Sequence, residues 1–260
     1  EHYSKKELGK EMYQFFIEDE NAAEDFVTIE GSDVNHIKNV LRMKPGEKIR
    51  VCTRNGQNYF CSISDITESF VRADILEKEA ESTELPCRIY LFQGLPKNDK
   101  MEWIIQKTVE LGVYEVIPVA MKNCVVKLDD KKAKSKVMRW QAIAESAAKQ
   151  SKRSLIPEVK MPMSYKEAAA YAKQLDVKLV PYENEHGMAG TKAAVEQIQM
   201  GQSIAVFIGP EGGFAPEEIE LVQDEMQLIS LGKRILRTET AGIAALAILG
   251  YQLESSDVIE

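Results

Sequence analysis

Two stretches near the C-terminal end decide the fold: GPEGGFAP at residues 209–216 and LGKRILRTETA at residues 231–241. Each follows a short apolar run that is typical of a buried strand, and each leads into a pattern typical of a helix. In α/β proteins, ligands bind at the carboxyl ends of the parallel strands. Two glycine-bearing loops in equivalent positions therefore predict one shared pocket.

The composition of the first loop restricts the ligand. Its three glycines permit positive φ and let a ligand approach the bare backbone, and Pro216 suits the first position of a helix. Neither the dinucleotide pattern GxGxxG nor the Walker pattern GxxxxGK[ST] occurs. Three carboxylates in or beside the loop would repel a phosphate: Glu211, Glu217 and Glu218. The loop therefore favours a neutral or cationic ligand, and the alternative is a strand-to-helix turn that binds nothing.

Composition indicates a globular protein. The chain has 260 residues, of which 44% are apolar and 28% charged, with a net charge of -8, values that are ordinary for a soluble domain. No apolar run reaches the length of a membrane span. The four cysteines form no CxxC pair and no cluster with histidine, so no metal site is expected. We expect a cytoplasmic protein with reduced thiols.

The first part of the chain predicts a small β-barrel, because short strands follow one another closely with one helix. Ser32 or Asp33 would cap that helix, whose apolar positions are Val34, Ile37, Val40 and Leu41. The dipeptide at 55–56, Asn-Gly, predicts a hairpin turn. The expected strands are 13–17, 27–29, 48–53, 57–64 and 70–77. We assign residues 12–80 to this domain, and residues 1–11 to an extension or tag remnant.

The second part predicts an α/β domain over residues 81–260. Strands are expected at 88–92, 114–119, 177–182, 204–208 and 228–231. Helices are expected between them, at about 99–111, 130–150, 165–175 and 189–199, and after each of the two opening stretches. This alternation predicts a mainly parallel sheet with helices on both faces.

Two basic segments stand out in this acidic chain. Residues 122–153 hold ten lysines and arginines against three acidic residues, and residues 36–54 hold six against one. One segment lies in each expected domain, which favours binding of a polyanion across both. The alternative is that these are solvated helix faces.

The two C-terminal stretches together resemble the RsmE family, the small-subunit ribosomal RNA uracil-N3 methyltransferases of the SPOUT class. The likeness extends to residues 36–43, 97–112 and 140–157, and so covers nearly the whole chain after residue 11. It implies a PUA-like RNA-binding β-barrel before a SPOUT α/β domain with a C-terminal trefoil knot. It also implies a homodimer that binds S-adenosylmethionine. The implied cofactor-binding residues are Tyr182, Glu183, Ile208, Gly209, Pro210, Glu211, Gly212, Gly213, Leu231, Gly232, Ile235, Leu236 and Arg237.

The resemblance also implies 16S rRNA, or the small ribosomal subunit, as partner. The candidate RNA contacts are His36, Arg42, Lys44, Lys97, Lys122, Arg139, Lys152 and Arg153. The chain departs from the family at two places, because the family commonly has Arg near Asn123 and Gly near Lys152. Contacts to RNA through these segments are expected to differ from those of the family.

Methylation of uracil at N3 requires loss of the imide proton, so the reaction needs a cation and a base near the pocket. Arg237 is the candidate cation for the developing oxyanion, although pairing with Glu239 is the alternative. Glu211, Glu239 or a water is the candidate base. Thr238 and Thr240 are expected to cap the last helix. The remaining histidines, His2 and His186, form no catalytic constellation.

Other readings stay open from sequence alone. The chain could be a methyltransferase that acts on another RNA site, or a non-catalytic RNA-binding or assembly factor on the same scaffold. Nucleotide hydrolysis is disfavoured, because the Walker lysine is missing and carboxylates surround the glycine loop.

Overall fold

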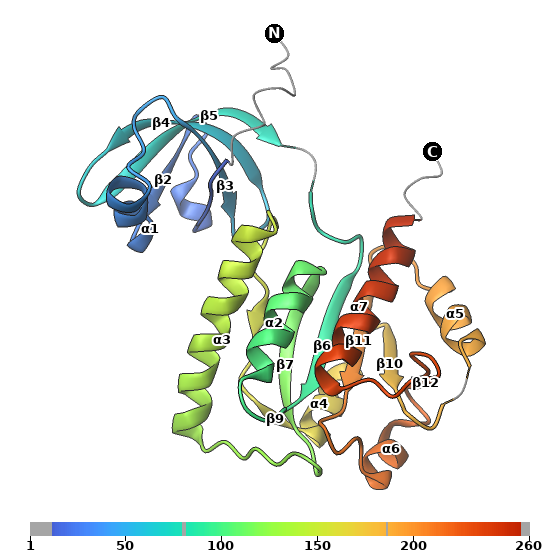
Figure 1. Ribbon diagram of the computed structural model, residues 1–260. Coiled ribbons are helices and arrows are strands. Elements are labelled where there is room, and N and C mark those ends of the chain that lie inside the picture. The colour runs from blue at the N-terminus through green and yellow to red at the C-terminus, as the bar shows by residue number, and fades with distance from the viewer. Residues whose placement is uncertain (1–11, 80–81, 186, 256–260) are drawn as a thin grey trace. The chain divides into compact units, whose positions relative to one another are not determined.

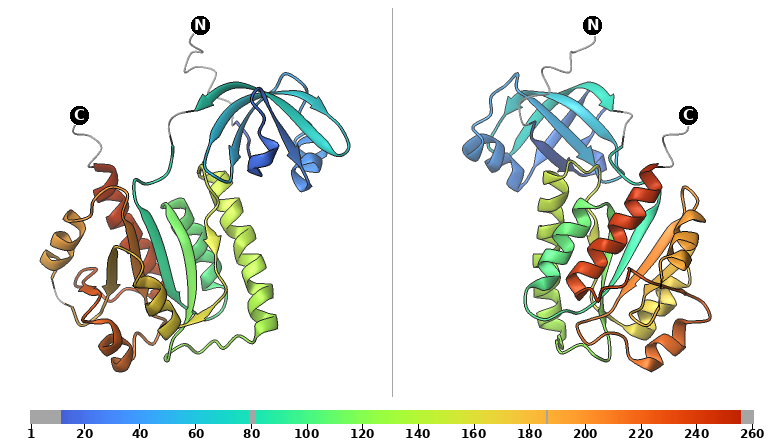
Figure 2. Two further views of the ribbon diagram at one scale, coloured as in Figure 1. Left: turned by 180° about the vertical axis from the view of Figure 1, so that it is seen from behind. Right: turned by 45° about the vertical axis from the view of Figure 1, so that its right-hand side comes forward.

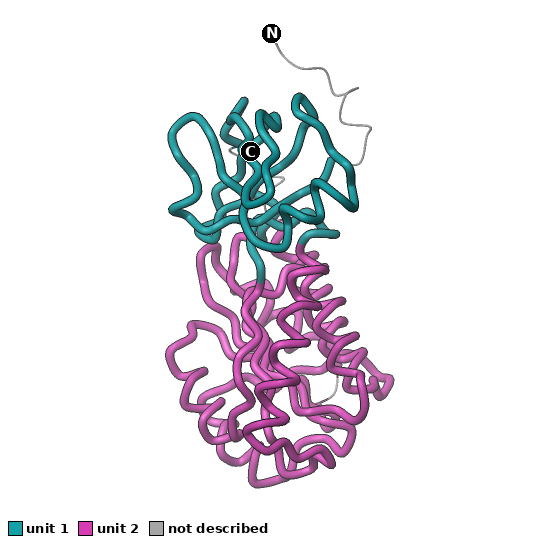
Figure 3. Tube along the Cα trace, turned by 90° about the vertical axis from the view of Figure 1, so that its left-hand side faces the viewer, with its two compact units in different colours: residues 1–84, 149–156 teal, residues 85–148, 157–260 magenta. Residues whose placement is uncertain are grey.

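The chain divides into two compact units in a computed structural model, which describes residues 12–79, 82–185 and 187–255 (Figure 3). One unit comprises residues 1–84 and 149–156, and the other comprises 85–148 and 157–260. The expected N-terminal extension and His186 lie outside the described residues, as does the expected boundary at 80–81.

The first unit is built on a five-stranded sheet in the order β1-β3-β4-β5-β2. β1 pairs with β3 in parallel, and the other pairs are antiparallel. Alternate residues of each strand enter one core, in which Val27, Ile29 and Ile49 are fully buried. The sheet curves around this core as a partial barrel (Figure 2), in agreement with the small β-barrel that the closely spaced short strands predicted. Its elements are β1 (Gln14–Ile17), η2 (Asp19–Asn21), β2 (Phe26–Glu30), β3 (Lys48–Thr53), β4 (Asn58–Ile66) and β5 (Phe70–Glu79).

The helix of this unit differs from the expected one. A short α1 (Ser32–Asn35) is followed by a π-turn, η3 (His36–Val40), and Gly31 rather than Ser32 or Asp33 precedes it at φ 71°. The π-turn contains an extra residue, closed by the bond from Leu41 N to His36 O at 2.8 Å. It rotates Val40 out of the apolar face, leaving this residue 64% exposed. The prediction that Val40 packs inward was therefore wrong.

Residues 149–156 return to the first unit and fasten to it through buried polar groups. Gln14 Nε2 donates to Arg153 O at 2.5 Å, and Asn58 Nδ2 donates to Ser154 Oγ at 2.8 Å. The guanidinium of Arg153 is buried against Glu84. The segment thus belongs to the first unit although residues 85–148, which belong to the other unit, separate it from residue 84 in sequence.

The second unit is built on a parallel sheet in the order β12-β10-β11-β6-β7-β8, with β9 also paired to β7. Every pair in it is parallel, which confirms the prediction from strand–helix alternation. The short strands β8 and β9 were not expected. The strands are β6 (Arg88–Gly94), β7 (Val113–Ala120), β8 (Glu158–Val159), β9 (Met163–Ser164), β10 (Val177–Pro181), β11 (Ser203–Ile208) and β12 (Gln227–Ile229).

Helices cover both faces of this sheet (Figures 1 and 2). On one face α4 and α6 pack against Phe92 and Phe207, whose rings stack at 4.3 Å. On the other face α2 and α7 pack against each other, and α7 contacts β6 and β11. Strand residues alternate between these two layers because their side chains point to opposite faces. The helices are α2 (Lys100–Glu110), α3 (Asp130–Gln150), α4 (Tyr165–Ala172), α5 (Ala189–Glu196), α6 (Pro216–Val222) and α7 (Thr238–Ser255).

The small residues of α7 serve packing inside the chain. Gly242 is buried, and a Cβ added there would lie 3.5 Å from Gln93 Oε1 and 3.8 Å from Ile208 Cγ1. Ala245 is also buried, whereas Ala247 is exposed.

Within the described residues, no helix has the length and hydropathy needed to cross a membrane. The trefoil knot stays a prediction.

Candidate active site

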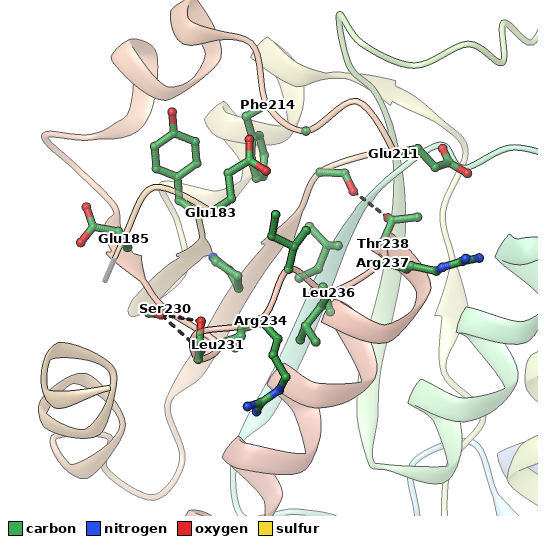
Figure 4. A pocket seen from close by; sticks show the side chains of 18 of the residues that line it. Glu183, Glu185, Glu211, Phe214, Ser230, Leu231, Arg234, Leu236, Arg237 and Thr238 are labelled. Carbon is green, nitrogen blue, oxygen red and sulfur yellow. Dashed lines mark hydrogen bonds between the residues drawn. The ribbon is translucent and has the colours of Figure 1, made fainter. Parts of the chain in front are cut away.

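One pocket of about 660 Å³ opens at the carboxyl ends of β10, β11 and β12 (Figure 4). These three strands are neighbours in the sheet and run parallel, so the loops that follow them meet at one edge. All the predicted cofactor-binding residues except Gly212 line this pocket. The sequence argument from two equivalent glycine loops therefore agrees with the geometry, and the loop after β10 completes the wall.

The glycine loop, residues 209–215, is a tight turn. Gly213 N donates to Pro210 O at 2.9 Å, and Gly213 has φ 67°, a conformation that favours glycine. Gly212 faces away from the pocket toward Asn123, whose Nδ2 donates to Gly212 O at 3.0 Å and to Gly213 O at 3.2 Å. A Cβ at residue 212 would lie 2.9 Å from Asn123 Cβ. Gly212 therefore permits close packing of two segments, and Asn123 supports the loop.

Two of the three glutamates that were expected to face a ligand do not line the pocket. Glu218 is buried, accepting from Ala215 N and Lys122 N at 2.8 Å each, which satisfies the start of α6. Glu217 pairs with the ammonium of Lys122. The prediction that both repel phosphate at the site was wrong, because these groups are engaged in capping and ion pairing.

The charge of the pocket is mixed. Its acidic side chains are Glu183, Glu185 and Glu211, and its basic side chains are Lys100, Lys233, Arg234 and Arg237. In Figure 4, Glu183 lies near Phe214, whereas Glu211 and Arg237 both lie toward the opposite side. The pocket thus has the carboxylate of Glu183 on one side, and on the other side a carboxylate and a guanidinium that form no ion pair with each other.

Lys100 joins two carboxylates at the pocket rim. Its Nζ lies 3.0 Å from Glu211 Oε1 and 3.3 Å from Glu239 Oε2, and Lys97 N also donates to Glu211 Oε1 at 3.0 Å. Partial burial raises the pKa of Glu211, but these donors outweigh it and the net pKa lies below the ordinary value. A carboxylate with a lowered pKa is a weak proton acceptor, so Glu211 is poorly suited as the base.

Sequence reasoning missed Lys100, although its position in the first turn of α2 carried a signal. Lys100 begins α2, which lies in the segment 97–112 of this chain that resembles the family. This segment follows a strand of the predicted parallel sheet. The carboxyl end of that strand lies at the same edge as the glycine loop. Phe214, Ser230 and Thr238 also line the pocket and were not predicted.

We expect Lys100→Gln to raise the pKa of Glu211 and to lower the free energy of unfolding at neutral pH by about 0.5–1 kcal/mol. Because the pKa of Glu211 is lower in the folded state, this carboxylate stabilises the fold at pH values above the ordinary glutamate pKa of 4.5. That stabilisation is lost as the pH falls through the lowered pKa. The difference between wild type and variant should therefore vanish in acid, as measured by urea unfolding at several pH values. Lys107→Gln, which removes an ion pair with Glu110 and the contact of the ammonium with the ring of Trp103 but leaves Glu211 untouched, is the control. A difference that is independent of pH would contradict the ion pair.

Arg237 is exposed, and its guanidinium forms no ion pair with any residue that the structure describes. Glu239, the alternative partner, is held by Lys100 instead. The backbone carbonyl of Arg237 accepts from Thr240 N and Ala241 N at 2.9 Å each, so it begins α7. The backbone of Arg237 is thus fixed at the start of α7, whereas its guanidinium has no ion-pair partner among the described residues.

Thr238 does not cap α7 with its side chain, contrary to expectation. Its hydroxyl donates to Gly209 O at 2.6 Å and accepts from Gln93 Nε2 at 2.9 Å. Thr238 is the first residue of the helix, and its hydroxyl points into the protein, where it is shared between two other segments.

Three candidate RNA contacts in the first unit are exposed: His36, Arg42 and Lys44. His36 contacts the ring of Phe15 edge to face at 6.5 Å between centroids. Arg42 has φ 55°, which turns the chain sharply after the π-turn. These side chains stay available to a ligand.

The other two candidates of that unit differ from each other. Lys152 is exposed, and its Nζ donates to Met12 O at 2.7 Å. Arg153 is only 3% exposed and is bonded to Glu84. A buried guanidinium that is committed to a carboxylate cannot also bind phosphate, so we correct the assignment of Arg153 to a structural ion pair.

The three candidates of the second unit are exposed, and two of them are paired. Lys122 contacts Glu217, and Arg139 Nε lies 2.7 Å from Glu102 Oε1. No side-chain bond of Lys97 is seen among the described residues, and its backbone supports Glu211. The pair of Lys122 with Glu217 is exposed and contributes little to stability, so phosphate can compete for Lys122 at small cost. Glu102 is largely buried and contacts Arg139 through both carboxylate oxygens, so Arg139 is less available to phosphate.

The chain matches two families of known domains. Residues 83–250 match the family described as RNA methyltransferase domain, and residues 29–76 match the RNA methyltransferase PUA domain. The first match covers most of the unit that contains the pocket, and the second covers most of the partial barrel. They define the class of protein as an RNA methyltransferase.

Several proteins named ribosomal RNA small subunit methyltransferase E are similar over most of the chain. The Bacillus subtilis protein is 39% identical, covering 94% of this chain and 98% of its own. The Mesomycoplasma hyopneumoniae protein is 37% identical, covering 89% and 96%. A crystal structure of the Neisseria gonorrhoeae protein bound to S-adenosyl methionine is similar with TM-score 0.80 and 32% identity, covering 92% and 97%. This chain belongs to the ribosomal RNA small subunit methyltransferase E family, as its sequence motifs predicted.

Proposed function

We propose that this protein transfers a methyl group from S-adenosylmethionine to N3 of a uridine in the 16S rRNA of the small ribosomal subunit. The observation that carries the proposal is the pocket at the ends of β10, β11 and β12, in a chain of this family. The similar Neisseria protein binds S-adenosyl methionine, which supports the same cofactor here.

The residues of the pocket suit S-adenosylmethionine. A volume of about 660 Å³ is large enough for a ligand of this size. Gly213 and Gly232 adopt φ 67° and 111° and leave bare backbone beside the cavity. Phe214 and Leu236 offer apolar surface to a purine, and the carboxylate of Glu183 attracts a cation. When bound, the cofactor supplies an electrophilic methyl group on a positively charged sulfur.

The chain's own residues would act on the uracil. Loss of the imide proton leaves a negative charge that the two neighbouring carbonyl oxygens share. We assign stabilisation of this charge to Arg237, because its guanidinium is exposed at the pocket and free of an ion pair with any described residue. We assign the role of proton acceptor to Glu239 or a water, since the donors around Glu211 lower its pKa and make it a weak proton acceptor.

RNA binding is assigned to the PUA-like unit and to exposed cations around the pocket. His36, Arg42 and Lys44 lie together in sequence on the first unit, and Lys97 and Lys122 lie beside loops of the second. Each phosphate contact would release a counterion, so affinity should fall steeply with salt. A ribosomal substrate would place this activity in the cytoplasm.

We also propose that the protein is a homodimer, as the family resemblance implies. Trp103 on α2 and Tyr251 on α7 are 53% and 76% exposed, and these two helices pack side by side. Light scattering should then give twice the chain mass of 29.3 kDa.

Calorimetric titration with S-adenosylhomocysteine, with ATP as control, tests the cofactor assignment. Saturable binding of S-adenosylhomocysteine alone would support the methyltransferase. Preference for ATP would favour a nucleotide site. Binding of neither ligand, even with small ribosomal subunits present, would favour a non-catalytic RNA-binding factor.

A further inference from the structure

A buried chain of hydrogen bonds runs from β6 to both C-terminal loops. Gln93 is fully buried near the end of β6, and its Nε2 donates to Thr238 Oγ1 at 2.9 Å and to Gly94 O at 3.0 Å. Thr238 Oγ1 donates in turn to Gly209 O at 2.6 Å, the bond drawn at Thr238 in Figure 4. Three segments that are far apart in sequence thus meet through two side chains.

The direction of every bond in this chain is fixed. The carbonyls of Gly94 and Gly209 can only accept, so Gln93 must present its nitrogen and Thr238 must donate to Gly209. Gln93 Oε1 is buried and makes no hydrogen bond to any described residue. The amide is therefore oriented solely by the two bonds of its nitrogen.

The chain connects the two loops that line the pocket. Gly209 begins the glycine loop, and Thr238 follows directly on the 231–237 loop and begins α7. Gln93 does not line the pocket, and it belongs to a strand paired on both sides, to β11 and to β7. A rigid central strand thus holds one end of each loop at a fixed separation.

We propose that Thr238 and, acting through it, Gln93 are positioning residues that set the spacing of the glycine loop and the 231–237 loop for cofactor binding. This inference rests on the proposed function. Removal of the Thr238 hydroxyl would leave Gly209 O and an N–H of Gln93 buried without partners. The two loops would move apart so that water or another polar group could pair with these atoms. The loop spacing that binds the cofactor would then be populated less often.

Thr238→Val removes the hydroxyl and keeps the shape of the side chain. We expect the Kd of S-adenosylhomocysteine to rise about tenfold, equivalent to about 1.4 kcal/mol. Thr238→Ser keeps the hydroxyl and should bind within about threefold of wild type. Thr240→Val, on the exposed side of the same helical turn, is the matched control and should not change binding.

A purely structural role would lower thermal stability without changing the affinity of the folded protein. Positioning instead predicts that Thr238→Val raises KM for S-adenosylmethionine while kcat at saturating cofactor stays within about threefold. Gln93→Glu gives a second test, because a carboxylate would accept from the Thr238 hydroxyl and deprive Gly209 O of its donor. This variant should show the same rise in KM.

The outcomes separate this inference from the proposed function. If wild-type protein does not bind S-adenosylhomocysteine, the proposed function fails, and this inference with it. If wild type binds and folded Thr238→Val and Gln93→Glu bind equally well, this inference alone is overturned. Weak binding by Thr238→Ser as well as Thr238→Val would also overturn it, since the hydroxyl would then not be the cause.

Discussion

Gly94→Ala is expected to weaken binding of S-adenosylhomocysteine about a hundredfold, or by about 2.7 kcal/mol. A Cβ at residue 94 would lie 2.7 Å from Pro210 N and 2.8 Å from Pro210 Cδ. Pro210 is a backbone neighbour in the glycine loop and cannot move aside as a flexible side chain would. The methyl group would therefore push the glycine loop off the end of β6, and calorimetry measures the consequence.

The control for this substitution is Gly190→Ala in the first turn of α5. No atom lies within 4 Å of a Cβ there, and its φ is not positive. Its affinity for S-adenosylhomocysteine should equal that of wild type, with a small gain in helix stability. Unchanged affinity in Gly94→Ala would mean that contact between β6 and the glycine loop does not shape the pocket.

Arg237→Ala is expected to lower kcat for methyl transfer about 100- to 1,000-fold, as for loss of a donor at a developing oxyanion. Arg237 lies at the pocket and its guanidinium forms no ion pair with a described residue, so truncation leaves no buried charge behind. The affinity for S-adenosylhomocysteine should stay within about threefold of wild type, because this product of the cofactor lacks the uracil whose charge we assign Arg237 to stabilise. Single-turnover kinetics with saturating small subunits measures the rate.

Arg234→Ala is the matched control for the loss of one positive charge on the same loop. In Figure 4 the Arg234 side chain points away from Glu211 and Arg237. Its kcat should change by less than about threefold. Equal losses in the two variants would indicate that the loop's overall charge, rather than Arg237, supports the reaction.

Local patterns were enough to predict the parallel sheet and the two loops. Apolar runs that alternate with helical periodicity specify strand and helix, and parallel strands place their carboxyl ends at one edge. From this alone, the loops in residues 209–216 and 231–241 were expected to share a pocket, and the structure brings residues of both together with the loop at 182–183. Their part in cofactor binding stays a prediction.

Contacts between segments that are far apart in the chain could not be predicted from the sequence. The return of residues 149–156 to the first unit depends on the buried pair of Arg153 with Glu84, and basic residues in a polar run gave no sign of burial. The π-turn that exposes Val40 depends on one extra residue per turn, which apolar spacing does not reveal. Thr238 resembled a helix cap, because its neighbours in sequence do not show Gln93 or Gly209.

The most direct test of the central claim is the identity of the nucleoside that the protein modifies. Small ribosomal subunits that lack the modification would be incubated with the protein and S-adenosylmethionine, and the 16S rRNA would be digested and analysed by mass spectrometry. We predict that 3-methyluridine appears at a single position. Methylation of another atom or another RNA, or no transfer by protein that binds S-adenosylhomocysteine, would contradict the account.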